Sequence, residues 1–117
     1  MELVALLSTG KGSWGQVAGL VKQGEWEKII VIGTSFAREF KIPGISFEFV
    51  EYDSEKGLLQ LKKEFEKKLE GKFNNLEVAL SIASGNGKEH MALLSALLSI
   101  PVGVRFAALT KTGVVIL

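Results

Sequence analysis

Residues 76–100, LEVALSIASGNGKEHMALLSALLSI, decide the fold, because three patterns that together define a structural unit follow one another there. In residues 76–83 large apolar side chains alternate with mostly small ones, and this period of two predicts a strand. Residues 84–88 (SGNGK) come next, and their glycines permit backbone angles that other residues avoid. Residues 89–100 are good helix formers with almost no polar face. A strand, a glycine-rich turn and a helix in this order can present backbone N–H groups to an anion.

The residues before this stretch contain further strand and helix patterns. Residues 2–8 (ELVALLS) form a nearly continuous apolar run, typical of a central strand covered on both faces. Ser13 and Gln16 have the spacing of a capping box, which predicts that a helix begins there. Residues 28–33 are a second buried strand, and a short helical turn after them must close before Pro43.

Three more elements complete the pattern. In residues 45–50 apolar side chains alternate with more polar ones, which suits a strand at the edge of the sheet. We expect Asp53 or Ser54 to cap the next helix, whose outer face is filled with lysine and glutamate. Residues 102–109 and 113–117 are two strand patterns joined by a short turn, which predicts a hairpin.

Strands that alternate with helices predict a mostly parallel sheet with helices on both faces. Right-handed crossovers favour the strand order 3-2-1-4, with the C-terminal β-hairpin at the far edge. The sequence therefore predicts a single domain over residues 1–117 with a Rossmann-like fold of the α/β class.

Composition excludes several classes of function. With 47% hydrophobic and 23% charged residues, the chain has the composition of a soluble globular domain. A net charge of +1 is too small for a duplex nucleic-acid surface, and no apolar run is long enough to span a bilayer. The chain lacks cysteine, which rules out disulfides and thiolate metal sites, and it shows no signal-peptide pattern. We expect a cytoplasmic protein without membrane contact.

Motifs for the common cofactors are missing as well. There is no G-x-x-x-x-G-K-[ST] and no G-x-G-x-x-G, so a Walker-type ATPase and an ordinary dinucleotide site are disfavoured. A single histidine, His90, cannot make a zinc site, and no acidic cluster suggests magnesium. We expect no metal and no cofactor.

The candidate site lies where the first and fourth strands are neighbours. Ligands of open α/β sheets bind outside the carboxyl ends of the strands at such a switch point. Two loops rich in Gly, Ser and Lys leave there, residues 8–13 and 84–88, and each opens a helix whose N-terminus favours negative charge. With Ser35 after the second strand, the candidate ligand-binding residues are Ser8, Thr9, Gly10, Lys11, Gly12, Ser13, Ser35, Ser84, Gly85, Asn86, Gly87 and Lys88. The alternative is that these are ordinary turn residues.

The last predicted helix raises two further points. His90 at its start is either a hydrogen-bonded packing group or a general base, since its reference pKa lies near neutrality. Beyond His90 no charged residue occurs up to Ile100, so either other elements cover this helix or a second subunit does. The second possibility predicts a homodimer through the helix of residues 89–100.

The chain resembles the CARF family, the CRISPR-associated Rossmann-fold sensor domains. The first strand runs into a Ser/Thr-Gly loop, residues 7–10 (LSTG), and the strand order ends in a hairpin. The family's fourth-strand loop often reads Thr-Gly-Gly-Thr-Lys before a methionine and an alanine/leucine-rich helix. Here that loop is SGNGK, so Ser84, Gly85 and Lys88 match the threonine, first glycine and lysine. Asn86 replaces the second glycine, and Met91 lies one residue further along the chain than the methionine of the family motif.

This resemblance implies a homodimer that binds cyclic oligoadenylate across its two-fold axis. A stand-alone domain would be a sensor that acts through a partner, or a ring nuclease. A ring nuclease cleaves its ligand without metal, as a 2′-hydroxyl of the ligand attacks the adjacent phosphate. The catalytic candidates are then Lys88 and Lys11 for charge stabilisation, with His90 or a serine assisting proton transfer.

Two other functions fit the same residues. The crevice suits a binder of, or enzyme for, a smaller phosphate-bearing metabolite. Alternatively, the chain is a structural interaction domain that docks a partner protein through its apolar last helix.

Overall fold

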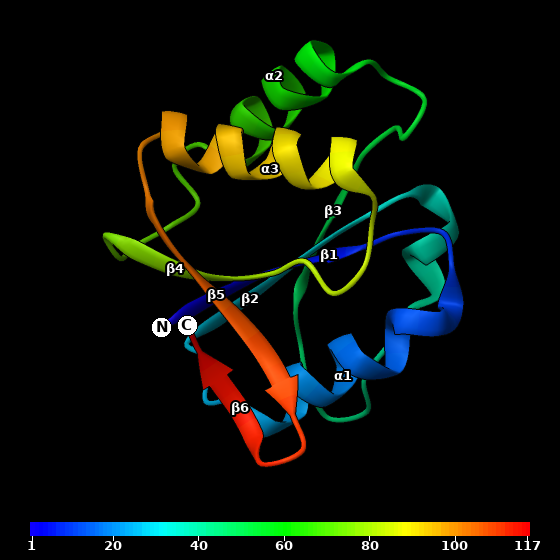
Figure 1. Ribbon diagram of the computed structural model, residues 1–117, viewed down its shortest axis with the longest axis vertical. Coiled ribbons are helices and arrows are strands. Elements are labelled where there is room, and N and C mark those ends of the chain that lie inside the picture. The colour runs from blue at the N-terminus through cyan, green and yellow to red at the C-terminus, as the bar shows by residue number, and fades with distance from the viewer.

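The computed structural model describes residues 1–117, except for the side chain of Lys11. A six-stranded sheet in the order β3-β2-β1-β4-β5-β6 forms its centre (Figure 1). The strands are β1 (Glu2–Leu7), β2 (Lys28–Gly33), β3 (Glu48–Glu51), β4 (Glu77–Ser81), β5 (Gly103–Thr110) and β6 (Gly113–Ile116). The helices are α1 (Trp14–Gln23), α2 (Leu58–Leu69) and α3 (Gly87–Ser99), with the 3-10 helices η1 (Lys11–Ser13) and η2 (Ser35–Glu39).

Neighbouring strands are parallel except for β5 and β6, which form the antiparallel hairpin. The Rossmann-like α/β fold, the 3-2-1-4 order and the terminal hairpin are therefore confirmed. The third strand lies at the edge of the sheet, as its alternating pattern predicted. It is shorter than expected, because Ile45 pairs only with Ile42 in an isolated bridge and the ladder with β2 starts at Glu48.

The central strand β1 is buried along its whole length, which explains its continuous apolar sequence. Successive side chains of a strand point to opposite faces, so Leu3, Ala5 and Leu7 join one apolar cluster, while Val4 and Leu6 join another. Helix α1 packs in the first cluster, whereas α2 and α3 cover the opposite face of the sheet (Figure 1).

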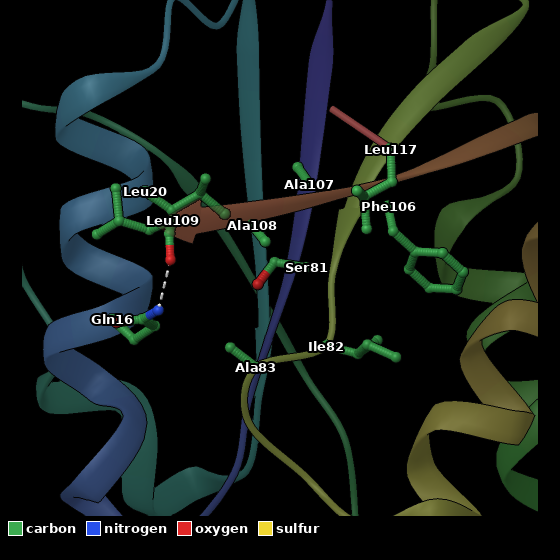
Figure 2. A pocket seen from close by; sticks show the side chains of 10 residues that line it. All are labelled: Gln16, Leu20, Ser81, Ile82, Ala83, Phe106, Ala107, Ala108, Leu109 and Leu117. Atoms are coloured by element: carbon green, nitrogen blue, oxygen red, sulfur yellow. Dashed lines mark hydrogen bonds between the residues drawn. The ribbon is translucent and has the colours of Figure 1, made fainter. Parts of the chain in front are cut away.

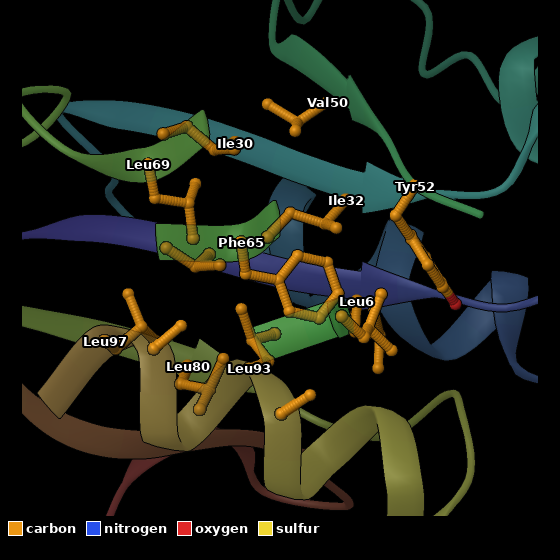
Figure 3. Close-up of a cluster of buried hydrophobic side chains, with 14 of the residues drawn as sticks. Leu6, Ile30, Ile32, Val50, Tyr52, Phe65, Leu69, Leu80, Leu93 and Leu97 are labelled. Atoms are coloured by element: carbon orange, nitrogen blue, oxygen red, sulfur yellow. The ribbon is translucent and has the colours of Figure 1, made fainter. Parts of the chain in front are cut away.

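The cluster beneath α2 and α3 is the larger core. Figure 3 shows Phe65 of α2 and Leu93 and Leu97 of α3 directed toward Leu6 and Leu80 of the sheet. All five side chains are fully buried. Each such side chain contributes about 1.5–3 kcal/mol through removal of its apolar surface from water.

Helix α1 begins where the sequence predicted, whereas α2 begins later than predicted. Ser13 is the N-cap residue of α1, but its side chain makes no capping hydrogen bond. The predicted helix start is confirmed, but the capping box does not form, and Gln16 Nε2 instead donates to Leu109 O of β5 at 2.9 Å. Helix α2 starts after Gly57, later than a cap at Asp53 would allow, since Asp53 Oδ1 accepts from Glu55 N at 2.9 Å and closes a separate turn.

Helix α3 has both a covered and an uncovered apolar side. Ala92, Leu93, Ala96 and Leu97 are buried against α2 and the sheet. Met91 is 58% and Leu98 57% exposed on the other side. Neighbouring elements thus cover one side of this helix and leave apolar side chains exposed on the other. No helix in the described part of the chain combines the length and the apolar character needed to cross a membrane.

Candidate functional site

A hydrogen bond joins the two loops that leave the switch point of the sheet. Ser84 Oγ, in the β4–α3 loop, accepts from Ser8 N at 2.8 Å, at the end of β1. Ser8 O in turn accepts from Trp14 Nε1 at 3.2 Å, so both backbone groups of Ser8 are held. Ser84 is 3% exposed, and its hydroxyl therefore connects the loops within the protein. The loops after β1 and β4 lie together at the carboxyl edge of the sheet.

Gly85 sits at the tightest point of the β4–α3 loop. Its φ of +101° is one that L side chains rarely adopt. A Cβ at this position would lie 2.5 Å from Leu6 Cδ2 and 3.1 Å from both Glu89 Oε1 and His90 Nε2. The backbone of this loop consequently approaches the core as closely as only glycine permits.

A reciprocal capping box fixes the start of α3. Asn86 Oδ1 accepts from Glu89 N at 2.9 Å, and Glu89 Oε1 accepts from Asn86 N at 2.9 Å. Glu89 is 1% exposed, and its other oxygen accepts from Tyr52 Oη at 2.5 Å. Burial, together with the hydrogen bond to Glu89, raises the pKa of Tyr52 far above its usual range, so the phenol remains a donor. Tyr52, which follows β3, thereby secures the loop after β4.

Lys88 is directed toward the loop between β3 and α2. Its Nζ donates to Ser54 O and to Lys56 O, each at 2.8 Å. Two of the three donors of the ammonium are thus occupied by backbone carbonyls. This ammonium was predicted to bind a ligand, whereas in the structure it connects the start of α3 to residues 54–56.

His90 is half-buried, and its Nε2 lies 2.8 Å from Ser84 O. Because a carbonyl can only accept, Nε2 carries the proton in this arrangement. The structure therefore shows His90 as a hydrogen-bonded packing group of the β4–α3 loop. A role as general base would fall to Nδ1 and stays a prediction.

The other predicted residues differ in their surroundings. Gly10, Gly12 and Gly87 are exposed, and a Cβ added to any of them would meet nothing within 4 Å. Thr9 and Ser13 belong to the same β1–α1 connection, while the side chain of Lys11 lies outside the described residues. Ser35 begins η2 and lines a different, polar pocket of about 270 Å³ with Thr34 and residues 51–54.

The structural roles of three residues in this region were not identified from the sequence, and Asn86 was predicted only to bind the ligand. Asn86 and Glu89 carry a recognisable signal, because N-x-x-E before an apolar run is a capping-box pattern. Tyr52 carries no such signal, since its hydrogen bond to Glu89 spans 37 positions of the chain.

A pocket of about 310 Å³ opens beside the β4–α3 loop (Figure 2). It is bounded by α1, the end of β4, the second half of β5 and the C-terminal residue. Its lining residues are Gln16, Leu20, Ser81, Ile82, Ala83, Phe106, Ala107, Ala108, Leu109 and Leu117. None of these ten residues has a charged side chain. The pocket was not predictable from the sequence, because its lining has the composition of an ordinary core.

Two solved structures are similar to this chain. One is the crystal structure of protein VC1899 from Vibrio cholerae, with a TM-score of 0.68 and 13% identity over 98% of this chain and 33% of that chain. The other is Enterococcus italicus Csm6 bound to cyclic hexa-2′-fluoro-hexa-dAMP, with a TM-score of 0.62 and 14% identity over 95% of this chain and 34% of that chain.

The chain thus spans about a third of the length of each solved chain. No family model matches the sequence, and no curated protein does. At such low identity the likeness shows the fold alone. The chain therefore has the six-stranded Rossmann-like fold that it shares with a part of VC1899 and a part of Csm6.

Proposed function

We propose that this chain is a nucleotide-ligand binding domain that senses cyclic oligoadenylate as a homodimer. The observation that carries the proposal is the Ser8–Ser84 hydrogen bond, which brings two glycine-rich loops together at the switch point of the sheet. The similarity in fold to Csm6, which was solved with a cyclic hexa-dAMP analogue, supports this ligand class. The residues shared with CARF domains support it independently.

The start of α3 supplies the anion-binding groups of the proposed site. The first N–H groups of a helix have no partner within the helix, and the helix dipole favours negative charge there. The capping box uses the N–H of Glu89, so those of Gly87 and Lys88, the first two helical residues, are available for phosphate oxygens. Gly10 and Gly12 in the neighbouring loop let a ligand approach the backbone closely.

The proposed homodimer uses the uncovered side of α3. Met91 and Leu98 are exposed there, and Leu94 is half-buried. Val104 and Phe106 of β5 are also only partly buried and pack against the same core. A second copy of the chain, related by a two-fold axis through this surface, would cover both sets of apolar side chains. It would also set two copies of the Gly-rich loops into one assembly.

The placement of Lys88 favours sensing over cleavage. A ring nuclease must stabilise the negative charge that develops on the attacked phosphate, and Lys88 is the described candidate for that role. Its ammonium instead binds two backbone carbonyls. We therefore expect this chain to retain cyclic oligoadenylate without converting it to a linear product.

The test uses labelled cyclic tetra- and hexa-adenylate with the purified chain. Binding is measured by calorimetry, products by chromatography and oligomeric state by sedimentation. We expect a dimer that retains one of the two rings intact. Failure to retain either ring would refute the proposed ligand, a monomer at micromolar concentration would refute the dimer, and rapid appearance of linear product would show a nuclease.

A charge variant tests the site itself. Gly87→Asp adds a carboxylate at the first helical residue of α3, in open space, where it favours the helix and repels phosphate. We expect the affinity for the cyclic ligand to fall by at least about tenfold, equivalent to roughly 1.4 kcal/mol, while the protein remains folded. The matched control is Gln60→Glu, which adds the same charge in the first turn of α2, and it is expected to bind normally.

A further inference from the structure

The pocket of Figure 2 arises because two neighbouring strands separate. Strands β4 and β5 are paired along four residues, from the pair Glu77 and Gly103 to the pair Leu80 and Phe106. Strand β4 ends one residue later, whereas β5 continues to Thr110 with β6 on its other edge. The pocket lies in the wedge between the diverging strands.

The lining of the pocket shows that it follows strand edges. Residues 106–109 of β5 all line it, and so do residues 81–83 at the end of β4. Successive side chains of a strand point to opposite faces, so consecutive residues can line one pocket only along the edge of the strand. The edge of β5 that faces β4 has no strand partner beyond Phe106. Its backbone donors and acceptors therefore border the pocket.

The chemistry of the wall is apolar with few polar groups. Leu20, Phe106 and Leu109 are among the large apolar side chains that line it. Gln16 Nε2 donates to Leu109 O at 2.9 Å, and this bond closes one side of the pocket. Ser81 is 1% exposed, and Figure 2 shows its hydroxyl pointing into the space between Ala83 and Gln16.

We propose that this wedge binds one flat heteroaromatic ring, the base of a nucleotide, lying between the edges of β4 and β5. A base presents donors and acceptors along its rim, which suit strand edges, and two apolar faces, which suit the leucine and phenylalanine walls. The volume of about 310 Å³ lies at the small end of ligand pockets, roughly 300–1,000 Å³, and fits one such ring. The lining has no cationic side chain, which disfavours phosphate.

The position of the wedge links it to the proposed anion site. Ala83 immediately precedes Ser84, and Gln16 lies three residues after Ser13, so both glycine-rich loops border the pocket. A nucleotide can place its base in the wedge and its phosphate at the loops. This inference rests on the proposed function and deepens it, because it assigns the base and the phosphate to separate parts of the site.

The test fills the pocket without touching the loops. Ala108→Ile places three more carbon atoms in the wedge. The control is Val115→Ile, because Val115 of β6 pairs with Ala108 but does not line the pocket. NMR titrations compare adenosine monophosphate with ribose 5-phosphate, which lacks the base. We expect wild type and Val115→Ile to prefer adenosine monophosphate at least about tenfold, and Ala108→Ile to lose that preference while ribose 5-phosphate binds unchanged.

A second variant covers the case in which Ala108→Ile does not fold. Ser81→Ala removes the buried hydroxyl and is expected to weaken adenosine monophosphate alone. If both folded variants bind adenosine monophosphate as wild type does, the inference is overturned, even when cyclic hexa-adenylate still binds. If cyclic hexa-adenylate fails to bind but the preference for the base disappears in Ala108→Ile, the proposed function fails and the base pocket stands.

Discussion

The two loops at the switch point are built in opposite ways. The loop of residues 84–87 contains a glycine that no other residue can replace without strain. It is also held by a capping box with Glu89, to which Tyr52 donates, and by the hydrogen bond between His90 and Ser84 O. In the loop of residues 8–13, Ser8 is anchored, but Gly10 and Gly12 have open space around them. One side of the site is therefore preorganised by the core, and the other has room for a ligand.

The largest contrast is expected between glycines of the two loops. Gly85→Ala forces a side chain into a positive φ and against Leu6 Cδ2, and should lower the free energy of unfolding by about 2–4 kcal/mol. Gly10→Ala meets no atom and should change it by less than about 1 kcal/mol, in the stabilising direction. Urea denaturation measures both variants. Equal effects at the two positions would show that the loops do not differ in this way.

A smaller effect is expected for the hydrogen bond between Tyr52 and Glu89. Tyr52→Phe leaves a buried carboxyl oxygen without its donor and should cost about 1–3 kcal/mol of stability. The loop of residues 84–87 should exchange its amide protons faster in this variant, as measured by hydrogen exchange. Unchanged amide exchange in this loop would show that the hydrogen bond of Tyr52 does not stabilise it.

The ionisation of Tyr52 provides a direct test of its burial. It is the single tyrosine of the chain, so the phenolate absorbance reports this residue alone. Its pKa is raised in the folded state, so the unfolded chain releases this proton first, near pH 10. Stability from this group is therefore full below about pH 10 and is lost as the pH rises further. We expect phenolate to appear only together with unfolding; a normal titration of the folded protein would contradict the buried placement.

The smallest effect is expected for Lys88. Lys88→Met removes two hydrogen bonds to backbone carbonyls that are partly open to solvent, and should cost about 1 kcal/mol. Lys67→Met, on the exposed face of α2, is the control and should be neutral. Thermal unfolding compares the two. If Lys88→Met leaves stability unchanged but abolishes ligand binding, then Lys88 binds the ligand. Holding residues 54–56 would in that case not be its main role.

Much of the fold was predictable because its signals are local. The continuous apolar run of β1, the alternation before Ser84 and the short turn after Thr110 identified strands, and right-handed crossovers then gave their order. The start of α1 at Ser13 was predicted correctly, but the capping box itself does not form, because Gln16 donates to Leu109 of β5 instead. The N-x-x-E signal of Asn86 and Glu89 was present but was not used.

The sequence by itself determined the elements, their order and the meeting of two glycine-rich loops at one edge, because periodicity, glycine and chain direction act over a few residues. Only the tertiary structure decided that Lys88 binds the carbonyls of Ser54 and Lys56, that Tyr52 supports Glu89, and that β4 and β5 part to leave a pocket. These features depend on contacts between distant segments, whose partners are set by packing and leave no regular pattern in the sequence.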